Sequence, residues 1–151
     1  MYKNYKYMGL VLTILLMFSL TGCAISDSNA KLVPSSELNK KETFYVVLSK
    51  TDKRDIANTI AEVLTTKGYL ATSGNLNNIP SNVDVIVTYE DRWMWDITNY
   101  LIKLNMQFRN ADNMYPYLAG ETIRTSLIRK DVKGMVEETI NTMLNKSREV
   151  K

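Results

Sequence analysis

The sequence predicts an α/β two-layer sandwich (α+β), in which a four-stranded sheet carries two helices on one face. Two observations support this prediction. The apolar residues switch several times between a period of two, typical of strands, and a period near 3.6, typical of helices. The resulting order is strand, helix, strand, strand, strand, helix, or β-α-β-β-β-α. One long segment also alternates apolar and polar residues, so one side of the sheet is expected to face solvent.

The first expected elements are a buried strand and an amphipathic helix. Phe44–Leu48 is an aromatic and β-branched run between polar flanks, which is typical of a central strand. Thr51 or Asp52 is the expected N-cap of the helix, and Gly68 is its expected C′ residue. Tyr69–Ala71 can begin a further strand, but a loop rich in glycine, asparagine and proline follows. The expected buried face of the helix comprises Ile56, Ala57, Ile60, Val63 and Leu64.

The second half reads as three strands and a helix. Val83–Asp91 alternates except at Ile86, and in Thr98–Phe108 every second residue from Tyr100 onward is apolar or aromatic, so one face of that strand is expected to be core and the other wet. Tyr115–Arg124 follows a polar turn at Asn110–Asn113, which predicts a hairpin with Thr98–Phe108. Asp131 is the expected N-cap of the last helix. Its apolar positions are Met135, Val136, Ile140, Met143 and Leu144.

The N-terminus has the layout of a secretory signal. Lys3 and Lys6 precede thirteen mostly apolar residues, Met8–Leu20. At about 1.5 Å per residue this run spans about 20 Å, short of a hydrocarbon core of about 30 Å, which disfavours an uncleaved anchor ending at a buried cysteine. Leu20-Thr21-Gly22-Cys23 resembles the lipobox of bacterial lipoproteins. The resemblance implies lipidation of Cys23 and cleavage before it.

Three segments are therefore expected: a signal peptide over 1–22, lipidated Cys23 with a flexible tether over 23–42, and one domain over 43–151. The tether prediction rests on serine, asparagine and proline residues with little apolar periodicity. In diderm lipoproteins an aspartate after the lipidated cysteine marks retention at the inner membrane, and this chain has Ala24. The resemblance thus implies an outer-membrane protein facing the periplasm, or the outer surface of the plasma membrane in a monoderm.

The composition excludes several classes of function. The chain has no histidine, which excludes Ser-His-Asp and Cys-His catalysis and histidine-based zinc sites. Cys23 is the only cysteine, so no internal disulfide can form. The net charge of +3 loses two lysines with the signal peptide, which implies no nucleic-acid partner. No P-loop, dinucleotide fingerprint or EF-hand spacing is present. We expect no catalytic residue, metal or cofactor.

One segment, residues 90–96, concentrates both tryptophans and three carboxylates. The tryptophans could stack on a sugar or an acyl chain, or they could simply pack where two strands cross, with Arg92 paired to a neighbouring carboxylate. Acid–base catalysis by the carboxylates at 90, 91 and 96, or binding of a hard cation by them, is a further alternative. A basic stretch over 124–131 could hold an anionic head group or form a solvated rim. The candidate binding residues are Trp93, Trp95, Asp91, Asp96 and Arg124.

With these residues the chain resembles a group of small bacterial lipoproteins. The resemblance rests on the lipobox, the segment Asp-Val-Ile-Val-Thr-Tyr-Glu-Asp-Arg-Trp-Met-Trp-Asp at 84–96, and Ser-Leu-Ile-Arg-Lys at 126–130 before a helix. It spans Phe44–Leu144 and implies a fold and an envelope location without an activity. More distantly, the element order is similar to the lipoprotein of the lipopolysaccharide transport machine and to the amino-terminal domain of the Tol-system propeller protein, both interaction domains.

These observations lead to three hypotheses. The first is a non-enzymatic, lipid-anchored envelope protein that binds a protein partner through the tryptophan region or a sheet edge. The second is a lipid- or glycan-binding protein that uses Trp93, Trp95 and Arg124. The third is a hydrolase of unspecified type.

Overall fold

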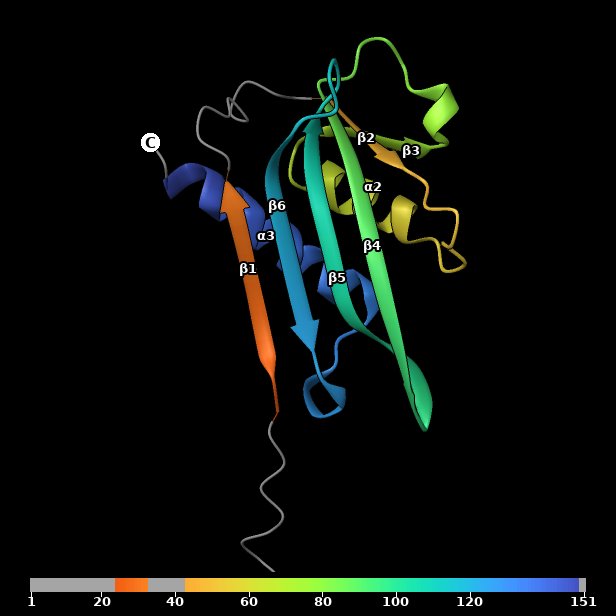
Figure 1. The fold of residues 1–151 in the computed structure, drawn as a ribbon, viewed down its shortest axis with the longest axis vertical. Helices are drawn as coiled ribbons and strands as arrows, with labels where there is room; N and C mark the ends of the chain where they lie inside the picture. The colour runs from red at the N-terminus through yellow and green to blue at the C-terminus, as the bar shows by residue number, and fades with distance from the viewer. Residues whose placement is uncertain (1–23, 33–42, 150–151) are drawn as a thin grey trace, which may run out of the picture.

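The chain folds into a mixed β-sheet of six strands with two α-helices behind it (Figure 1). The structure, a computed structural model, describes residues 24–32 and 43–149. Across the sheet the strand order is β1-β6-β5-β4-β2-β3. In chain order the elements are β1 (Ser26–Leu32), β2 (Thr43–Val47), α2 (Ile56–Thr66), β3 (Leu70–Gly74), the 3-10 turn η2 (Leu76–Asn78), β4 (Val85–Asp96), β5 (Thr98–Asn110), β6 (Pro116–Arg124), the 3-10 turn η3 (Ser126–Ile128) and α3 (Val132–Glu149).

The prediction of a four-stranded sheet is wrong, because β1 and β3 add a strand at each edge. β3 pairs in parallel with β2 and extends the short candidate at Tyr69–Ala71. β1 pairs antiparallel with β6, with Ser26 opposite Arg124, although the tether was expected to include these residues. The inward positions of β1 include Ser26 and Ser28, so the strand lacks the apolar period that identifies a buried strand. The arrangement of two helices on one face of a sheet is as expected.

The central strands β4, β5 and β6 form an antiparallel meander. Pairing of β5 with β6 confirms the predicted hairpin. β4 is longer than expected and continues through the tryptophan segment to a turn at Ile97, where Asp96 pairs with Thr98. Ile97 has a φ of 61°, in the left-handed region. The segment 90–96 is therefore the far end of a strand hairpin.

Helix α2 ends as the sequence indicated, but its N-cap is Asp55 and not the predicted Thr51 or Asp52, because the chain makes a left-handed turn at Asp55 (φ 60°) before the helix begins. Gly68 has a φ of +91° just after the helix, as expected of a C′ glycine. Asp52 lies upstream of the first helical residue, yet its Oδ2 accepts a hydrogen bond of 3.1 Å from the amide of Ala57. Burial by itself raises the pKa of Asp52, but hydrogen bonds from Tyr89 and from backbone amides outweigh it and lower the pKa. The Tyr89 hydroxyl, which donates to Asp52 at 2.6 Å, ties this residue to β4.

Helix α3 closes the second half of the core. Asp131 accepts a hydrogen bond of 2.9 Å from the amide of Gly134, which confirms the predicted cap. All five predicted apolar positions of this helix are buried. The sheet side chains that face the helices include Phe44, Val46, Val87, Leu104, Met106, Phe108 and Leu118, each at most 1% exposed. No helix among the described residues is both long and apolar enough to cross a bilayer.

The distance between α3 and β6 is set by a glycine in the sheet. A Cβ atom at Gly120 would overlap the Met143 side chain and lie 3.3 Å from Cγ2 of Thr139. Met143 is itself fully buried, so it has little room to move away. Gly120 therefore lets α3 pack directly on the backbone of β6.

We expect Gly120→Val to destabilise the domain by about 1–3 kcal/mol, because the added methyl groups would force α3 away from the sheet. Ala119→Val is the matched control, since Ala119 immediately precedes Gly120 in the same strand and faces the opposite, open side. Thermal unfolding of the two variants measures the difference. Equal melting temperatures would contradict the close packing.

Candidate functional site

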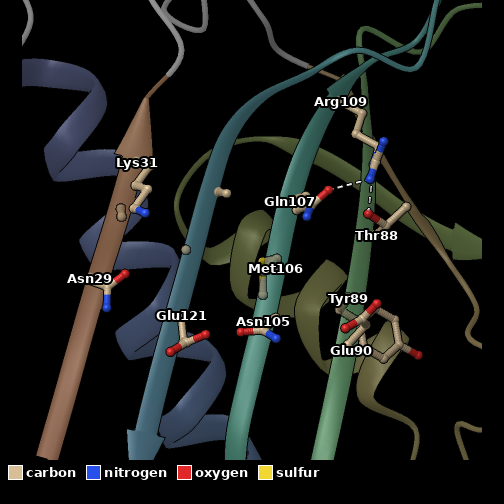
Figure 2. A pocket seen from close by; sticks show the side chains of 13 residues that line it. Asn29, Lys31, Thr88, Tyr89, Glu90, Asn105, Met106, Gln107, Arg109 and Glu121 are labelled. Carbon is tan, nitrogen blue, oxygen red and sulfur yellow. Dashed lines mark hydrogen bonds between the residues drawn. The ribbon is translucent and has the colours of Figure 1, made fainter.

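The sheet face opposite the helices is hollowed and polar (Figure 2). It forms a concavity of about 700 Å³ across β1, β6, β5 and β4. The strand register arranges its side chains in two rows. One row is Lys31, Ala119, Gln107 and Thr88, and the other is Asn29, Glu121, Asn105 and Glu90. This face is therefore a candidate binding surface, with amides, carboxylates and a lysine as its main functional groups.

Several of these side chains are held in place by the protein itself. The Nε of Arg109 donates to Thr88 Oγ1 at 3.1 Å, and its Nη1 donates to the Met114 carbonyl at 3.1 Å. Its Nη2 donates to the amide oxygen of Gln107, which leaves the Gln107 NH₂ group for other partners. Lys103 and Glu121 form an ion pair of 2.6 Å between half-exposed side chains. Such a pair adds little stability, but it orients the Glu121 carboxylate.

The sequence carries one signal for this surface, the alternation in Thr98–Phe108, which by itself predicts only a solvent-facing side of one strand. The wet face predicted from this one strand continues beyond Phe108, and its polar residues are Lys103, Asn105, Gln107 and Arg109. The register with β1, β4 and β6 turns this stripe into a surface, because it places Glu121 and Glu90 on either side of Asn105. Pairing across strands depends on the fold and cannot be read from one strand's pattern.

The two tryptophans of the predicted site lie in different surroundings. The Nε1 of Trp93 donates to Asp91 Oδ2 at 2.6 Å, and the guanidinium carbon of Arg54 lies 3.7 Å from the centre of its ring. Trp93 is thus a half-buried packing residue, stabilised by a cation–π contact. Trp95 is 72% exposed at the end of the hairpin. Of the two rings, Trp95 is the one available to a partner.

The carboxylates of the segment 90–96 do not converge on one point. Consecutive strand residues point to opposite faces, so Glu90 lines the open concavity while Asp91 bonds Trp93. Asp96, at the hairpin end, accepts a hydrogen bond from the Ser126 hydroxyl of η3. The structure therefore does not assemble these three groups as an acid–base pair. Among the described residues, no cluster of three or more His, Cys, Asp or Glu side chains is placed to hold a metal ion.

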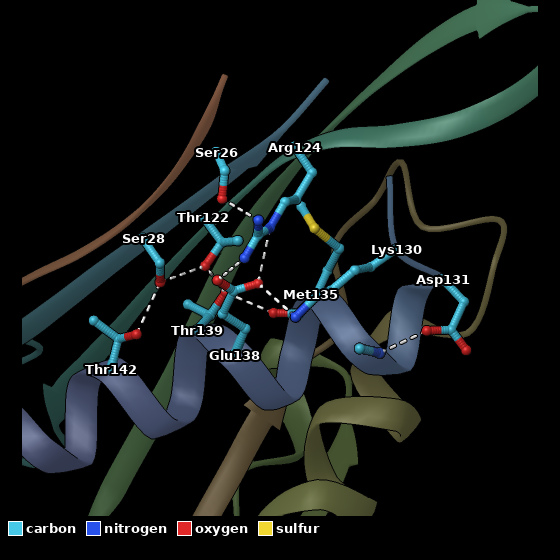
Figure 3. A network of polar contacts seen from close by, with 11 residues as sticks. Ser26, Ser28, Thr122, Arg124, Lys130, Asp131, Met135, Glu138, Thr139 and Thr142 are labelled. Carbon is cyan, nitrogen blue, oxygen red and sulfur yellow. Dashed lines mark hydrogen bonds and ion pairs between the residues drawn. The ribbon is translucent and has the colours of Figure 1, made fainter. Parts of the chain in front are cut away.

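Arg124, the remaining predicted binding residue, joins β1, β6 and α3 (Figure 3). Its Nε donates to Glu138 Oε2 at 3.1 Å, its Nη2 donates to Glu138 Oε1, and its Nη1 donates to the Ser26 hydroxyl. Lys130 adds a second ion pair to Glu138 at 3.1 Å. A ligand that bound Arg124 would have to compete with these contacts. The binding role of Arg124 therefore stays a prediction.

A chain of hydroxyl groups continues this network along β1. Ser28 is hydrogen bonded to Thr122 at 3.0 Å and to Thr142 at 2.8 Å. Thr139 donates to Thr122 at 2.8 Å, and both of these threonines are fully buried. Buried hydroxyl groups need hydrogen-bond partners, and here the hydroxyls of β1, β6 and α3 are partners of one another. The polar network explains how a strand with so few apolar residues is held in the sheet.

Comparisons with known proteins add information on the fold alone. No protein-family model matches the chain, and no curated protein matches it. Among solved structures it is similar to the PelC dodecamer from Paraburkholderia phytofirmans, with a TM-score of 0.56 and 11% identity over 80% of this chain and 95% of that chain. A variant of that PelC dodecamer gives a TM-score of 0.56 and 9% identity over 78% and 98% of the two chains.

A PDZ domain protein from Parabacteroides distasonis is also similar, with a TM-score of 0.49 and 10% identity over 90% of this chain and 39% of that chain. The predicted likenesses to the lipopolysaccharide-transport lipoprotein and to the Tol-system domain stay expectations, because the PelC structures are neither of these proteins.

The ion pairs of Glu138 predict a pH dependence of stability. Burial by itself raises the pKa of Glu138, but the hydrogen bonds and charges of Arg124 and Lys130 lower it below its usual 4.5. Because the folded pKa is the lower one, the ion pairs stabilise the fold above about pH 4.5, and this contribution is lost as the pH falls through the folded value. Glu138→Gln should therefore cost about 1–3 kcal/mol at neutral pH and progressively less in acid.

Urea unfolding between pH 3 and pH 7 measures this effect, with Glu137→Gln as the control on the exposed neighbour. A constant difference between Glu138→Gln and the unchanged protein across this pH range would contradict the ion-pair argument.

Proposed function

We propose that this chain is a lipid-anchored envelope lipoprotein that works without catalysis as a protein-interaction or assembly module. The observation that carries the proposal is the open sheet face, where two rows of polar side chains lie uncovered while both helices pack on the other side. Every side chain of the two rows except that of Ala119 is polar or charged, which suits a partner surface that also carries polar and charged groups.

The location within this proposal rests on the N-terminus. The lipobox-like residues 20–23 and the signal peptide lie outside the described residues. The folded domain begins almost at once after them, because Ile25 is hydrogen bonded to Thr125 and β1 starts at Ser26. A lipid on Cys23 would thus hold the domain close to its membrane. With Ala24 after the cysteine, we propose the periplasmic side of the outer membrane.

The partner to test first is a second copy of the chain. PelC, to which the fold is similar over nearly the whole length of that protein, was solved as a dodecamer. The likeness concerns the fold and carries no interface with it. It nevertheless makes self-association the most direct form of an assembly role.

A second candidate function is binding of lipid or glycan at the tryptophan end. The 72% exposure of Trp95 favours it, since an exposed indole offers an apolar ring for stacking. The contacts of Trp93 with Arg54 and Asp91 limit this role to Trp95.

In-cell photocrosslinking tests the proposed surface. A benzophenone amino acid at Asn105, in the middle of the concavity, should give a stoichiometric protein adduct, whereas the same group at Glu62, exposed on α2, should not. An adduct of twice the chain mass would establish self-association. Equal adducts at both positions, or only lipid or glycan at Asn105, would contradict the proposed interaction face.

Replacement of the anchor cysteine tests the location. Cys23→Ser should leave an uncleaved precursor that lacks the thioether lipid, because serine offers no thiolate to the acylating enzyme. The mass of the purified protein and its fractionation with membranes measure both effects. Normal processing of this variant would rule out the lipobox interpretation.

A further inference from the structure

We infer that the end of the domain nearest Cys23 rests on a lipid surface, with Trp95, Ile97 and Leu127 in contact with the lipid. These three side chains are 72%, 85% and 75% exposed, and we call them the apolar tip. Ile25 and Met94 beside them are 55% and 43% exposed. The inference rests on the proposed lipid anchor and adds the orientation of the domain on its membrane.

The apolar tip is assembled from two segments distant in sequence. Trp95 lies at the end of β4, Ile97 forms the turn between β4 and β5, and Leu127 comes from η3. The Ser126 hydroxyl donates to Asp96, and Arg129 Nη1 donates to Thr98 Oγ1 at 3.0 Å, so η3 is tied to the hairpin turn. In Figure 1 this turn, η3 and the start of β1 all lie at the lower end of the sheet.

The chain enters the fold at this same end. The amide of Ile25 donates to Thr125 Oγ1 at 3.1 Å, and the amide of Thr125 donates to the Ile25 carbonyl at 3.2 Å. Thr125 immediately precedes η3. Cys23 is two residues before Ile25 in the sequence, and two extended residues span at most about 7 Å. A lipid on Cys23 would therefore bring this end of the sheet, and not the opposite one, to the membrane surface.

Neither the backbone conformation nor the packing of the domain favours an isoleucine at position 97. Its φ of 61° lies in a region that a β-branched side chain rarely adopts and that glycine or asparagine would occupy with less strain. With 85% of its surface exposed, Ile97 also gains almost nothing from packing within the domain. A strained isoleucine that faces solvent therefore points to an apolar partner outside the fold.

The chemistry of the tip favours the membrane interface as that partner. An indole with its polar N–H suits the boundary between head groups and acyl chains. Arg129, exposed at the same end and bonded to Thr98, supplies a cation at the depth of the phosphates. Because both features lie where the lipid anchor would enter, we commit to a lipid surface in preference to a second copy of the chain.

The two tryptophans allow a direct test, since the chain contains no others. Trp93→Phe leaves Trp95 as the only tryptophan, and Trp95→Phe leaves Trp93 as the matched control. Full chains are reconstituted into vesicles of phosphatidylethanolamine and phosphatidylglycerol, with and without brominated acyl chains. We expect bromine to reduce the Trp95 emission roughly twofold, with a blue-shifted maximum, and to leave the Trp93 emission nearly unchanged.

A second variant links the quenching to the apolar tip. Ile97→Asn removes an apolar contact while suiting the positive φ, so it should keep or raise the melting temperature and should weaken the quenching of Trp95. Unquenched emission from Trp95 would overturn the inference. If the Trp95 emission maximum shifted to the blue but bromine did not quench it, the inference would also be overturned, and a protein contact would be indicated in place of lipid.

The anchor is scored separately by the mass of the N-terminal peptide. If Cys23 carries no lipid, the proposed anchoring fails. Quenching of Trp95 in that unlipidated protein is then measured with an excess of vesicles. Absence of quenching there would overturn the membrane contact, independently of the anchor.

Discussion

The contact between α3 and β6 is the constraint on which the rest of the structure depends. Gly120 removes the side chain that would separate them, and the buried Thr122–Thr139 hydrogen bond lies along the same contact. Thr122 and Arg124 then meet Ser28 and Ser26, which places β1 beside β6. A helix held farther from the sheet would leave these buried hydroxyls without partners, at a cost for each. The edge strand is therefore fixed by polar contacts to the helix as much as by its backbone pairing.

Because both helices pack on one side, the sheet has two faces with different roles. The helix side holds the core, with Phe44, Phe108 and Leu118 almost fully buried. The other side is free of helices, and its polar rows cross four strands. Polar side chains that remain hydrated do not lower the stability of the fold. They are therefore available to a polar partner. This difference between the two faces follows from strand geometry, since alternate residues point to opposite faces.

The candidate site illustrates what a local pattern can and cannot reveal. The tryptophans and carboxylates concentrated at 90–96 predict a single site, but they lie along one strand, which separates them by face. Trp93 turns inward against Arg54, while Trp95 points beyond the core. Arg124, expected at a ligand, is engaged by Glu138 from a helix that follows it in the chain. Partners distant in sequence decide these roles, and no spacing rule names them.

The sequence by itself determined the elements whose burial is periodic, namely the strand at Phe44, the β5–β6 hairpin and the apolar faces of both helices, together with the cap at Asp131 and the glycine at Gly68. Local chemistry sufficed because each signal lies within one turn or one strand. The tertiary structure alone decided that six strands form the sheet, that a polar segment at Ser26 pairs with Arg124, and that η3 meets the Ile97 turn. These features depend on hydrogen bonds between residues far apart in the chain, which leave no periodic trace in the sequence.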